Sequence, residues 1–281
     1  MNLWKRLRAD RPALLCLTFI ALLLLLGVFA PLVAPWDPTA IDVRDKFAGL
    51  SLEHPLGTDQ LGRDIFSRLI YGIRTTLGMS LLAMAVTVCL GALVGLIAGF
   101  FQGRTDEVIM RGCDVMMSFP SEVMILAVVG MLGPGLENVI IAAVVAKWPW
   151  YARMIRSVTR QYADRNYIRF ARAAGCGTCH ILFRHLLPGA AGEIVVLATL
   201  DTGSMILTIS ALSFLGLGVQ PPTPEWGMML SEAKEVMTMY PFQMLPAGLA
   251  ILLVAAAFNF LGDSLRDALD PTHIRERRSA A

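Results

Sequence analysis

Long apolar runs alternate along the chain with short polar stretches that hold most of its charged residues. A run of about twenty apolar residues is long enough to cross the hydrocarbon core of a bilayer as an α-helix. The pattern therefore predicts an all-α polytopic membrane protein with six transmembrane helices. The six runs lie at about 13–34, 77–101, 108–132, 138–155, 192–219 and 242–265.

Two of these runs have internal features that predict how they pack. In the second run, Gly91, Gly95 and Gly99 recur every four residues. This spacing places a smooth stripe on one face of the helix and lets another helix approach closely. In the third run, Pro120 is expected to bend the helix.

The first apolar run and the polar segment after it form a predicted N-terminal unit, residues 1–74. The run is too long for a secretory signal and lacks a cleavage site, so we expect a retained signal-anchor helix. The end of the polar segment has apolar residues at helical spacing, which predicts an amphipathic helix in the membrane interface. These residues are Ile65, Phe66, Leu69, Ile70 and Ile73.

Composition supports a membrane protein, and the basic residues predict its orientation. The chain has 281 residues, of which 56% are hydrophobic and 16% charged, fewer charges than a soluble domain of this size carries. By the positive-inside rule, the arginines beside the apolar runs place both termini in the cytosol. Residues 75–270 then form the transmembrane domain and 271–281 a basic cytosolic tail. As topology signals, these arginines do not indicate nucleic-acid binding.

The sequence contains no motif for ATP hydrolysis or for zinc-dependent proteolysis. It has neither G-x-x-x-x-G-K-[ST] nor H-E-x-x-H. The string Cys176-Gly-Thr-Cys179-His180 formally matches a haem-attachment motif, but it falls in a predicted cytosolic loop without another cofactor signature. A zinc site there would need further ligands, and His185 is the one candidate nearby. We therefore expect no metal centre and no cofactor in this chain.

The polar stretch 157–190 separates two apolar runs and predicts a helix-turn-helix on the cytosolic side. Asp164 or Asn166 is available as N-cap of its first helix, and Gly175 is placed to end that helix in a left-handed turn. Thr178 is expected to cap a second short helix, and Pro188 suits the first turn of the next one. Such an elbow is shaped to press against a soluble partner.

This stretch resembles the EAA loop of binding-protein-dependent ABC importer permeases, through Ala171-Arg-Ala-Ala-Gly175 and Leu187-Pro188. In that family the loop forms the coupling helix that docks into the cytosolic ATPase. The resemblance assigns coupling to Tyr167, Ala171, Arg172, Ala173, Ala174, Gly175, Leu187 and Pro188. Three positions depart from the motif, with Arg169 in place of Glu, Phe170 in place of Ala and His185 in place of Ile.

A second string, Leu56-Gly-Thr-Asp-Gln-Leu-Gly-Arg-Asp64 with Ser67-Arg68, resembles the peptide and nickel branch of these permeases, the dipeptide and oligopeptide permease C type. The runs 138–142, 150–154 and 197–201 look most like the nickel-import permease C subunit. The resemblance implies a type I importer permease fold in a bacterial inner membrane. It also implies a homologous second permease, two cytosolic ATPases that bind ATP and Mg, and an extracytoplasmic substrate-binding protein.

Four residues inside the predicted spans are candidates for a translocation path or a buried ion pair: Lys147, Asp201, Glu122 and Met205. Ionisable groups are costly within a membrane and mark functional or paired positions. Lys147 and Asp201 fall at similar depth, so they are expected either to pair or, in the case of Asp201, to line the path. Methionine is abundant, with 15 residues, but packing explains it as well as a soft-metal path does.

The function that follows is a permease that carries nickel or a metal chelate by ATP-driven alternating access. No histidine falls in a predicted span, which favours a metal carried with its own ligand over a bare ion. The same role for di- or oligopeptides is the alternative. A secondary transporter would work without an ATPase, and a membrane enzyme would need a catalytic cluster that the predicted interior lacks.

Overall fold

The computed structural model describes residues 10–269, and in that part of the chain it is mostly helical and contains no strand. The predicted tail at 271–281 lies outside the described residues. The long helices are α2 (Arg11–Val28), α4 (Ile65–Phe101), α5 (Gly103–Met117), α6 (Ser121–Leu132), α7 (Leu136–Ala163), α10 (Leu187–Phe214), α11 (Trp226–Glu235) and α12 (Leu245–Leu269). The short ones are α3 (Ala30–Val33), η1 (Val43–Asp45), α8 (Asn166–Ala173), α9 (Thr178–Ile181), the π-turn η2 (Leu182–Leu186) and η3 (Pro241–Met244).

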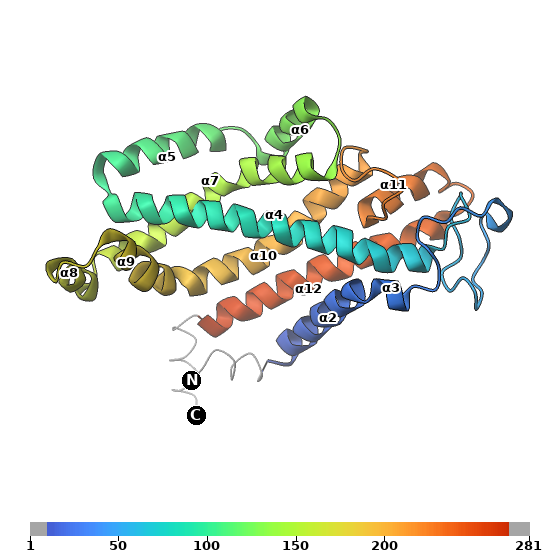
Figure 1. The fold of residues 1–281 in the computed structure, drawn as a ribbon, viewed down its shortest axis with the longest axis horizontal. Helices are drawn as coiled ribbons and strands as arrows, with labels where there is room; N and C mark the ends of the chain where they lie inside the picture. Colours follow the sequence, from blue (N-terminus) through green and yellow to red (C-terminus); the bar gives the residue numbers. More distant parts are fainter. Residues whose placement is uncertain (1–9, 270–281) are drawn as a thin grey trace.

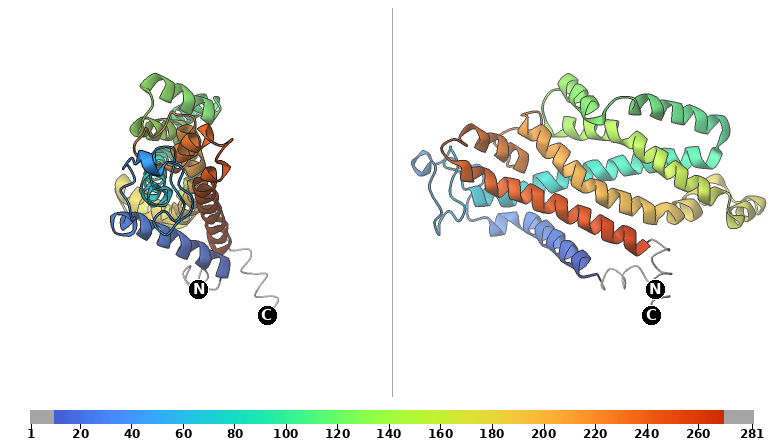
Figure 2. Two further views of the ribbon diagram at one scale, coloured as in Figure 1. Left: turned by 90° about the vertical axis from the view of Figure 1, so that its right-hand side faces the viewer. Right: turned by 180° about the vertical axis from the view of Figure 1, so that it is seen from behind.

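The long helices lie side by side along the length of the molecule (Figures 1 and 2). Helix α4 packs along α7 and also contacts α10, while α12 packs on α10 and α2. Helices α8 and α9 lie at one end of the molecule, and the polar segment 34–64 lies at the other (Figure 1). The two segments that the sequence placed on opposite sides of a membrane are therefore far apart.

Four helices of the described chain are long and apolar enough to cross a membrane, and the bent pair α5 and α6 makes a fifth if it forms one span. The four are Arg11–Val28, Ile65–Phe101, Thr178–Phe214 and Pro241–Leu269. Helix α7 is not among them, because Lys147 and Arg153 interrupt its apolar part. A multi-span helical protein is confirmed, and six spans remain a prediction.

Residues 65–74, predicted as an amphipathic helix of their own in the membrane interface, are the first turns of the long helix α4. Asp64 caps this helix, its carboxylate accepting a hydrogen bond from the Ser67 backbone at 2.7 Å. Ile65 and Ile73 are buried in a cluster with Trp226 of α11 and with residues of α2 and α12. The apolar face that suggested membrane contact is instead covered by protein.

The expected bend at Pro120 is a complete break. Helices α5 and α6 meet there at 82°. A second reversal joins α4 to α5, where Gln102 and Gly103 both have positive φ angles, 51° and 57°. This part of the chain therefore packs along α7 as two short helices with a sharp break between them.

The glycine stripe on α4 is confirmed as a packing surface, and it faces α7. A Cβ atom on Gly95 would lie 2.6 Å from the Ala152 carbonyl oxygen and 3.0 Å from the Arg156 backbone nitrogen. Gly91 and Gly99 face α7 in the same way, against Tyr151 and Thr159. Because the atoms met at Gly95 are backbone, a side chain there can be accommodated only if the two helices move apart.

We expect Gly95→Ala to destabilise the detergent-solubilised chain by about 1–3 kcal/mol, the usual cost of overpacking. The measurement is the thermal unfolding midpoint. Gly78 is the matched control, since it lies on the same helix and a Cβ there would meet nothing within 4 Å. Gly78→Ala should leave the midpoint unchanged or raise it, and an equal loss in both variants would rule out close packing as the cause.

Four buried charges hold the polar end of the molecule together. Asp59 accepts a hydrogen bond from Arg63 Nε at 2.7 Å and from an Arg68 nitrogen at 2.8 Å. Glu232 of α11 lies 2.9 Å from Arg63 and 2.6 Å from Arg68. Both arginine side chains are only 2% exposed. This charge cluster fixes segment 34–64 and the start of α4 to α11. It also accounts for the spacing of Asp59, Arg63 and Arg68 in the sequence string at 56–68 that resembles the peptide and nickel branch.

Candidate functional site

The predicted elbow is present as α8, α9 and η2. Ile168 and Ala171 of α8 are buried, and they join this short helix to the main core. Gly175 has a φ of 79°, and the Cys176 and Gly175 amides donate to the carbonyls of Ala171 and Arg172. This left-handed helix end is the one expected from the sequence.

The predicted start signals of the elbow helices are wrong. The N-cap of α8 is Arg165, and no side chain caps it. The N-cap of α9 is Gly177, so Thr178 is the first helical residue and its side chain does not cap the helix. Pro188 does lie in the first turn of α10, as expected. Tertiary burial of Ile168 and Ile181, not capping, fixes where these helices begin.

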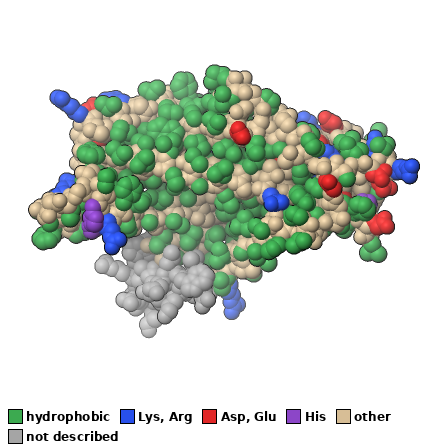
Figure 3. Space-filling view, in the orientation of Figure 1, with side chains coloured by type: hydrophobic (Ala, Val, Ile, Leu, Met, Phe, Trp, Pro, Cys, Tyr) green, Lys and Arg blue, Asp and Glu red, His purple; other side chains and the backbone are tan. Residues whose placement is uncertain are grey.

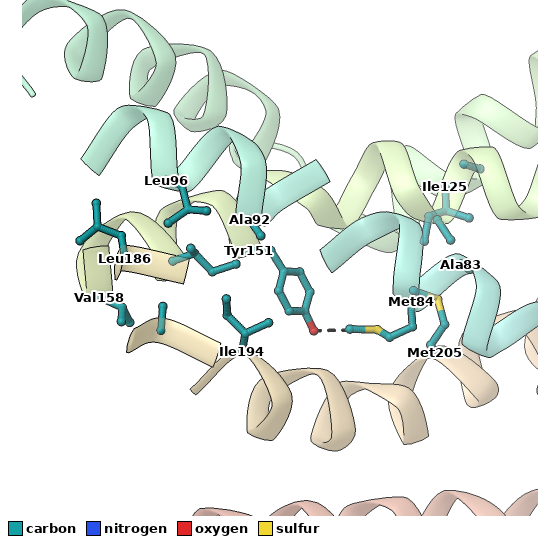
Figure 4. Close-up of a cluster of buried hydrophobic side chains, with 14 of the residues drawn as sticks. Ala83, Met84, Ala92, Leu96, Ile125, Tyr151, Val158, Leu186, Ile194 and Met205 are labelled. Carbon is teal, nitrogen blue, oxygen red and sulfur yellow. Dashed lines mark hydrogen bonds between the residues drawn. The ribbon is translucent and has the colours of Figure 1, made fainter. Parts of the chain in front are cut away.

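Elbow and bundle are continuous with each other. Helix α9 runs through the π-turn η2 directly into α10. Leu186, the last residue of the π-turn, is fully buried in the same cluster as Tyr151 of α7 and Met205 of α10 (Figure 4). Leu187 beside it packs against this cluster. The elbow and α10 are therefore joined both by a continuous helical backbone and by packed side chains.

Exposed aromatic side chains cover the outer face of the elbow. Phe170 is 76% exposed, Phe183 54% and Tyr167 47%. Three aromatic rings open to water at one end of the chain form an apolar surface of the kind that marks a protein contact. Phe170 and Phe183 were missed as site residues. The sequence pattern did not separate them clearly, because on α8 the exposed residues 167 and 170 lie on a flank adjacent to the buried residues 168 and 171.

The remaining assigned residues of the elbow are distributed over both of its faces. Arg172, Ala173 and Ala174 are exposed, whereas Ala171 is buried at 8%. The guanidinium of Arg172 lies 4.5 Å from the ring centre of Phe100 on α4. Ala171 and Arg172 thus join the elbow to the bundle, and Ala173 and Ala174 are exposed at the end of α8.

The four interior residues do not form one cluster. Lys147 Nζ donates to Ser204 Oγ at 3.1 Å, and Asp201 accepts a hydrogen bond from the Tyr151 hydroxyl at 2.6 Å. No ion pair between residues 10 and 269 joins Lys147 to Asp201, although Lys147 interacts electrostatically with Asp201 and with Glu122. Of the two alternatives, a direct pair is not seen within these residues, and two hydrogen bonds connect α7 to α10; that Asp201 lines the path stays a prediction. Met205 is fully buried in the core.

This polar group lies at the surface of the chain. Ser204 and Glu122 are exposed, while Lys147 and Asp201 are half-buried. The middle of the molecule is otherwise largely hydrophobic on the face seen in Figure 3. Glu122 begins α6, directly after the break at Pro120, and accepts a hydrogen bond from Ser121 at 3.0 Å. Lipid would solvate these groups poorly, so another polar or protein surface must face them.

The arginines at the end of α7 bind α5. Arg156 donates to both carboxylate oxygens of Asp106, and Arg160 lies 3.3 Å from the same carboxylate. Arg153 pairs with Asp114. These contacts fold α5 back along α7 next to the elbow.

No group of three or more His, Cys, Asp or Glu side chains in the described part of the chain could hold a metal ion. The five cysteines, Cys16, Cys89, Cys113, Cys176 and Cys179, are all free thiols. Cys176 and Cys179 are exposed.

Comparison with known proteins identifies the family. A model of the binding-protein-dependent transport system inner membrane component matches residues 91–275, and a model of the N-terminal membrane domain of oligopeptide transport permease C matches residues 2–55. A metal-staphylopine import system permease of Staphylococcus aureus is 46% identical and covers 96% of this chain and 94% of its own. The nickel transport system permease of Escherichia coli K12 is 42% identical, and the match covers 93% of this chain and 95% of that permease.

Two further similarities extend the picture. A glutathione transport system permease of Pectobacterium atrosepticum is 42% identical and covers 95% of this chain and 89% of its own. A solved chain of the MetNI methionine ABC transporter, in an inward-facing conformation, shares the fold with a TM-score of 0.57 at 18% identity, covering 73% of this chain and 98% of its own. Together with the elbow and the apolar helices, these matches show that the chain belongs to the permeases of binding-protein-dependent ABC importers, in the peptide and nickel branch.

Proposed function

We propose that this permease forms half of the translocation path for nickel or a nickel chelate and moves it by ATP-driven alternating access. The observation that carries the proposal is the continuous connection from the exposed aromatic elbow, through Leu186, to α10. That helix also carries Asp201 and Ser204, which bond α7. A push on the elbow would therefore shift the helix that holds the interior polar groups.

The partners follow from the two exposed surfaces. The aromatic face of the elbow suits docking of a cytosolic ATPase, which would bind ATP and Mg, and the assembly would hold two such subunits. The polar group around Lys147 and Asp201 suits the interface with a homologous second permease, where a hydrated path would cover it. Segment 34–64 would lie on the extracytoplasmic side and receive substrate from a binding protein. Both termini would then be cytosolic, in a six-span protein of the bacterial inner membrane.

A chelated metal fits the interior better than a bare ion. Of the described histidines, His54 is bonded to Asp64 at the polar end, and His180 and His185 lie in the elbow. The polar group of Lys147, Asp201 and Ser204, which would face a path between two permeases, can recognise charged and polar groups of an organic ligand. Peptides are the second candidate, since they present the same amine and carboxylate groups and a glutathione permease is similar to this chain.

The proposal is tested by reconstituting the permease with its ATPase subunits, partner permease and binding protein in vesicles. We expect uptake of a radiolabelled nickel chelate that requires both ATP and the binding protein. Uptake of free nickel driven by a proton or sodium gradient alone would overturn it. Uptake of di- or tripeptides in place of the chelate would establish the second candidate.

We expect Phe170→Ala to weaken ATPase docking by at least about 30-fold, the loss typical of an aromatic residue central to an interface. Because Phe170 is 76% exposed, the variant should fold normally. The measurement is affinity between the solubilised permease and its ATPase, with thermal unfolding as a check. Phe101, which is 54% exposed at the end of α4, is the control aromatic residue. Equal losses for Phe101→Ala and Phe170→Ala would refute a specific docking role.

A further inference from the structure

We propose that His180 and His185 form a binding site for a late first-row divalent metal ion on the elbow, through which metal in the cytosol slows coupling. The two imidazole rings lie 5.4 Å apart between centroids, at an interplanar angle of 69°. A metal bound by both rings would lie about 2.0–2.1 Å from one nitrogen of each. The observed separation suits two rings that converge on one ion.

The π-turn brings these histidines together. In a regular α-helix, residues five apart point about 140° away from each other. Between His180 and His185 the chain passes through η2, Leu182–Leu186, whose wider turn closes after five residues. The irregular turn therefore places two metal-ligating side chains side by side that a regular helix would separate. Insertions of this kind often accompany functional sites.

Neither imidazole has another role in the described structure. Within residues 10–269, neither ring makes a hydrogen bond or an ion pair, and their contacts are with each other and with the Tyr167 ring. His180 is exposed and His185 half-buried, and histidine side chains are visible at this end of the surface in Figure 3. Two free imidazoles on an open surface leave the remaining coordination positions to water or a small ligand.

The chemistry selects the ion class. Neutral imidazole suits Ni²⁺, Cu²⁺ and Zn²⁺, whereas Mg²⁺ and Ca²⁺ prefer oxygen ligands. With only two imidazoles fixed by the structure, the site would fill when cytosolic metal is plentiful.

The position of the site connects occupancy to transport. A bound metal would link α9 to the π-turn and hold the elbow in one geometry. The His185 ring lies 6.3 Å from the Tyr167 ring, which belongs to the exposed aromatic face. This consequence rests on the proposed function, in which that face docks the ATPase. Metal delivered to the cytosol would then act back on its own importer.

The binding step is tested on the purified full chain in detergent, prepared without a polyhistidine tag and titrated with Ni²⁺ or Zn²⁺ alone. We expect one ion per chain, bound with the moderate affinity of a two-imidazole site. His180→Ala and His185→Ala should each weaken it at least about tenfold, while His273→Ala should not. Unchanged affinity in both elbow variants would overturn the site. As a check independent of variant folding, the Cu²⁺ electron paramagnetic resonance spectrum should show two imidazole nitrogens, and a spectrum without them would also overturn it.

The feedback step is tested on the assembled importer with Ni²⁺ added on the ATPase side. We expect ATP hydrolysis to fall over the same concentrations at which the isolated chain binds metal, and the His185→Ala importer to resist. Equal inhibition of wild type and variant would overturn the feedback role. An assembly without any ATP hydrolysis would instead count against the proposed function, and the titration of the isolated chain would still decide the site.

Discussion

Arg68→Leu should destabilise the solubilised chain by about 3–5 kcal/mol, the cost of removing one member of a buried ion pair. Arg68 is 1% exposed and contacts both Asp59 and Glu232, so its loss leaves two carboxylates with Arg63 as their one cation. The thermal unfolding midpoint is the measurement. Arg74, six residues further along α4 and exposed, is the matched control, and Arg74→Leu should change the midpoint little.

The double variant Arg68→Leu, Glu232→Leu separates the ion pair from general damage. It leaves Asp59 and Arg63 as a balanced pair at 2.7 Å, so it should be more stable than either single variant. If the two losses simply add, the four charges do not act as one cluster.

Asp201→Asn should leave the fold intact and abolish most of the uptake. The asparagine oxygen can still accept the hydrogen bond that the Tyr151 hydroxyl donates at 2.6 Å, while Lys147 loses its nearby negative charge. We expect uptake in reconstituted vesicles to fall by at least about tenfold, equivalent to 1.4 kcal/mol on the transport barrier. Near-normal uptake with poor protein yield would instead assign Asp201 a structural role.

Asp201→Ala is the companion variant that tests the hydrogen bond itself. The Tyr151 side chain is 1% exposed, and without Asp201 its hydroxyl is left with the Met84 sulfur at 3.9 Å. An unsatisfied buried hydroxyl costs about 1–3 kcal/mol, so this variant should unfold at lower temperature than Asp201→Asn. Equal stability of the two variants would contradict a structural contribution from this bond.

Hydropathy predicted the membrane class and most long helices, because a twenty-residue apolar run has few alternatives to spanning a bilayer. Hydropathy did not show which helix faces pack against other helices and which face lipid. Ile65 and Ile73 have the same sequence pattern whether lipid or Trp226 covers them, so the pattern did not reveal that these residues belong to α4 and pack against α11. The break at Pro120 was expected in position, while its angle depends on the contacts between α5 and α7.

The site was predictable where a backbone rule applied and less so where side-chain partners decide. Gly175 ends α8 as a left-handed glycine should, and Pro188 lies in a first helical turn. The partners of Lys147 and Asp201 depend on the relative rotation of α7 and α10, which depth along the sequence does not fix. The π-turn between His180 and His185 follows no local sequence rule, so the closeness of the two rings could not be predicted from their spacing.

The charge cluster at the polar end has an evolutionary consequence. Asp59, Arg63, Arg68 and Glu232 come from two segments more than 150 residues apart in sequence, yet each carboxylate contacts both arginines. Loss of the charge at one position would leave the three other charges unbalanced and largely buried, so natural substitutions are expected to occur in compensating pairs. Among related chains, these four positions should either all carry charge or lose it two at a time.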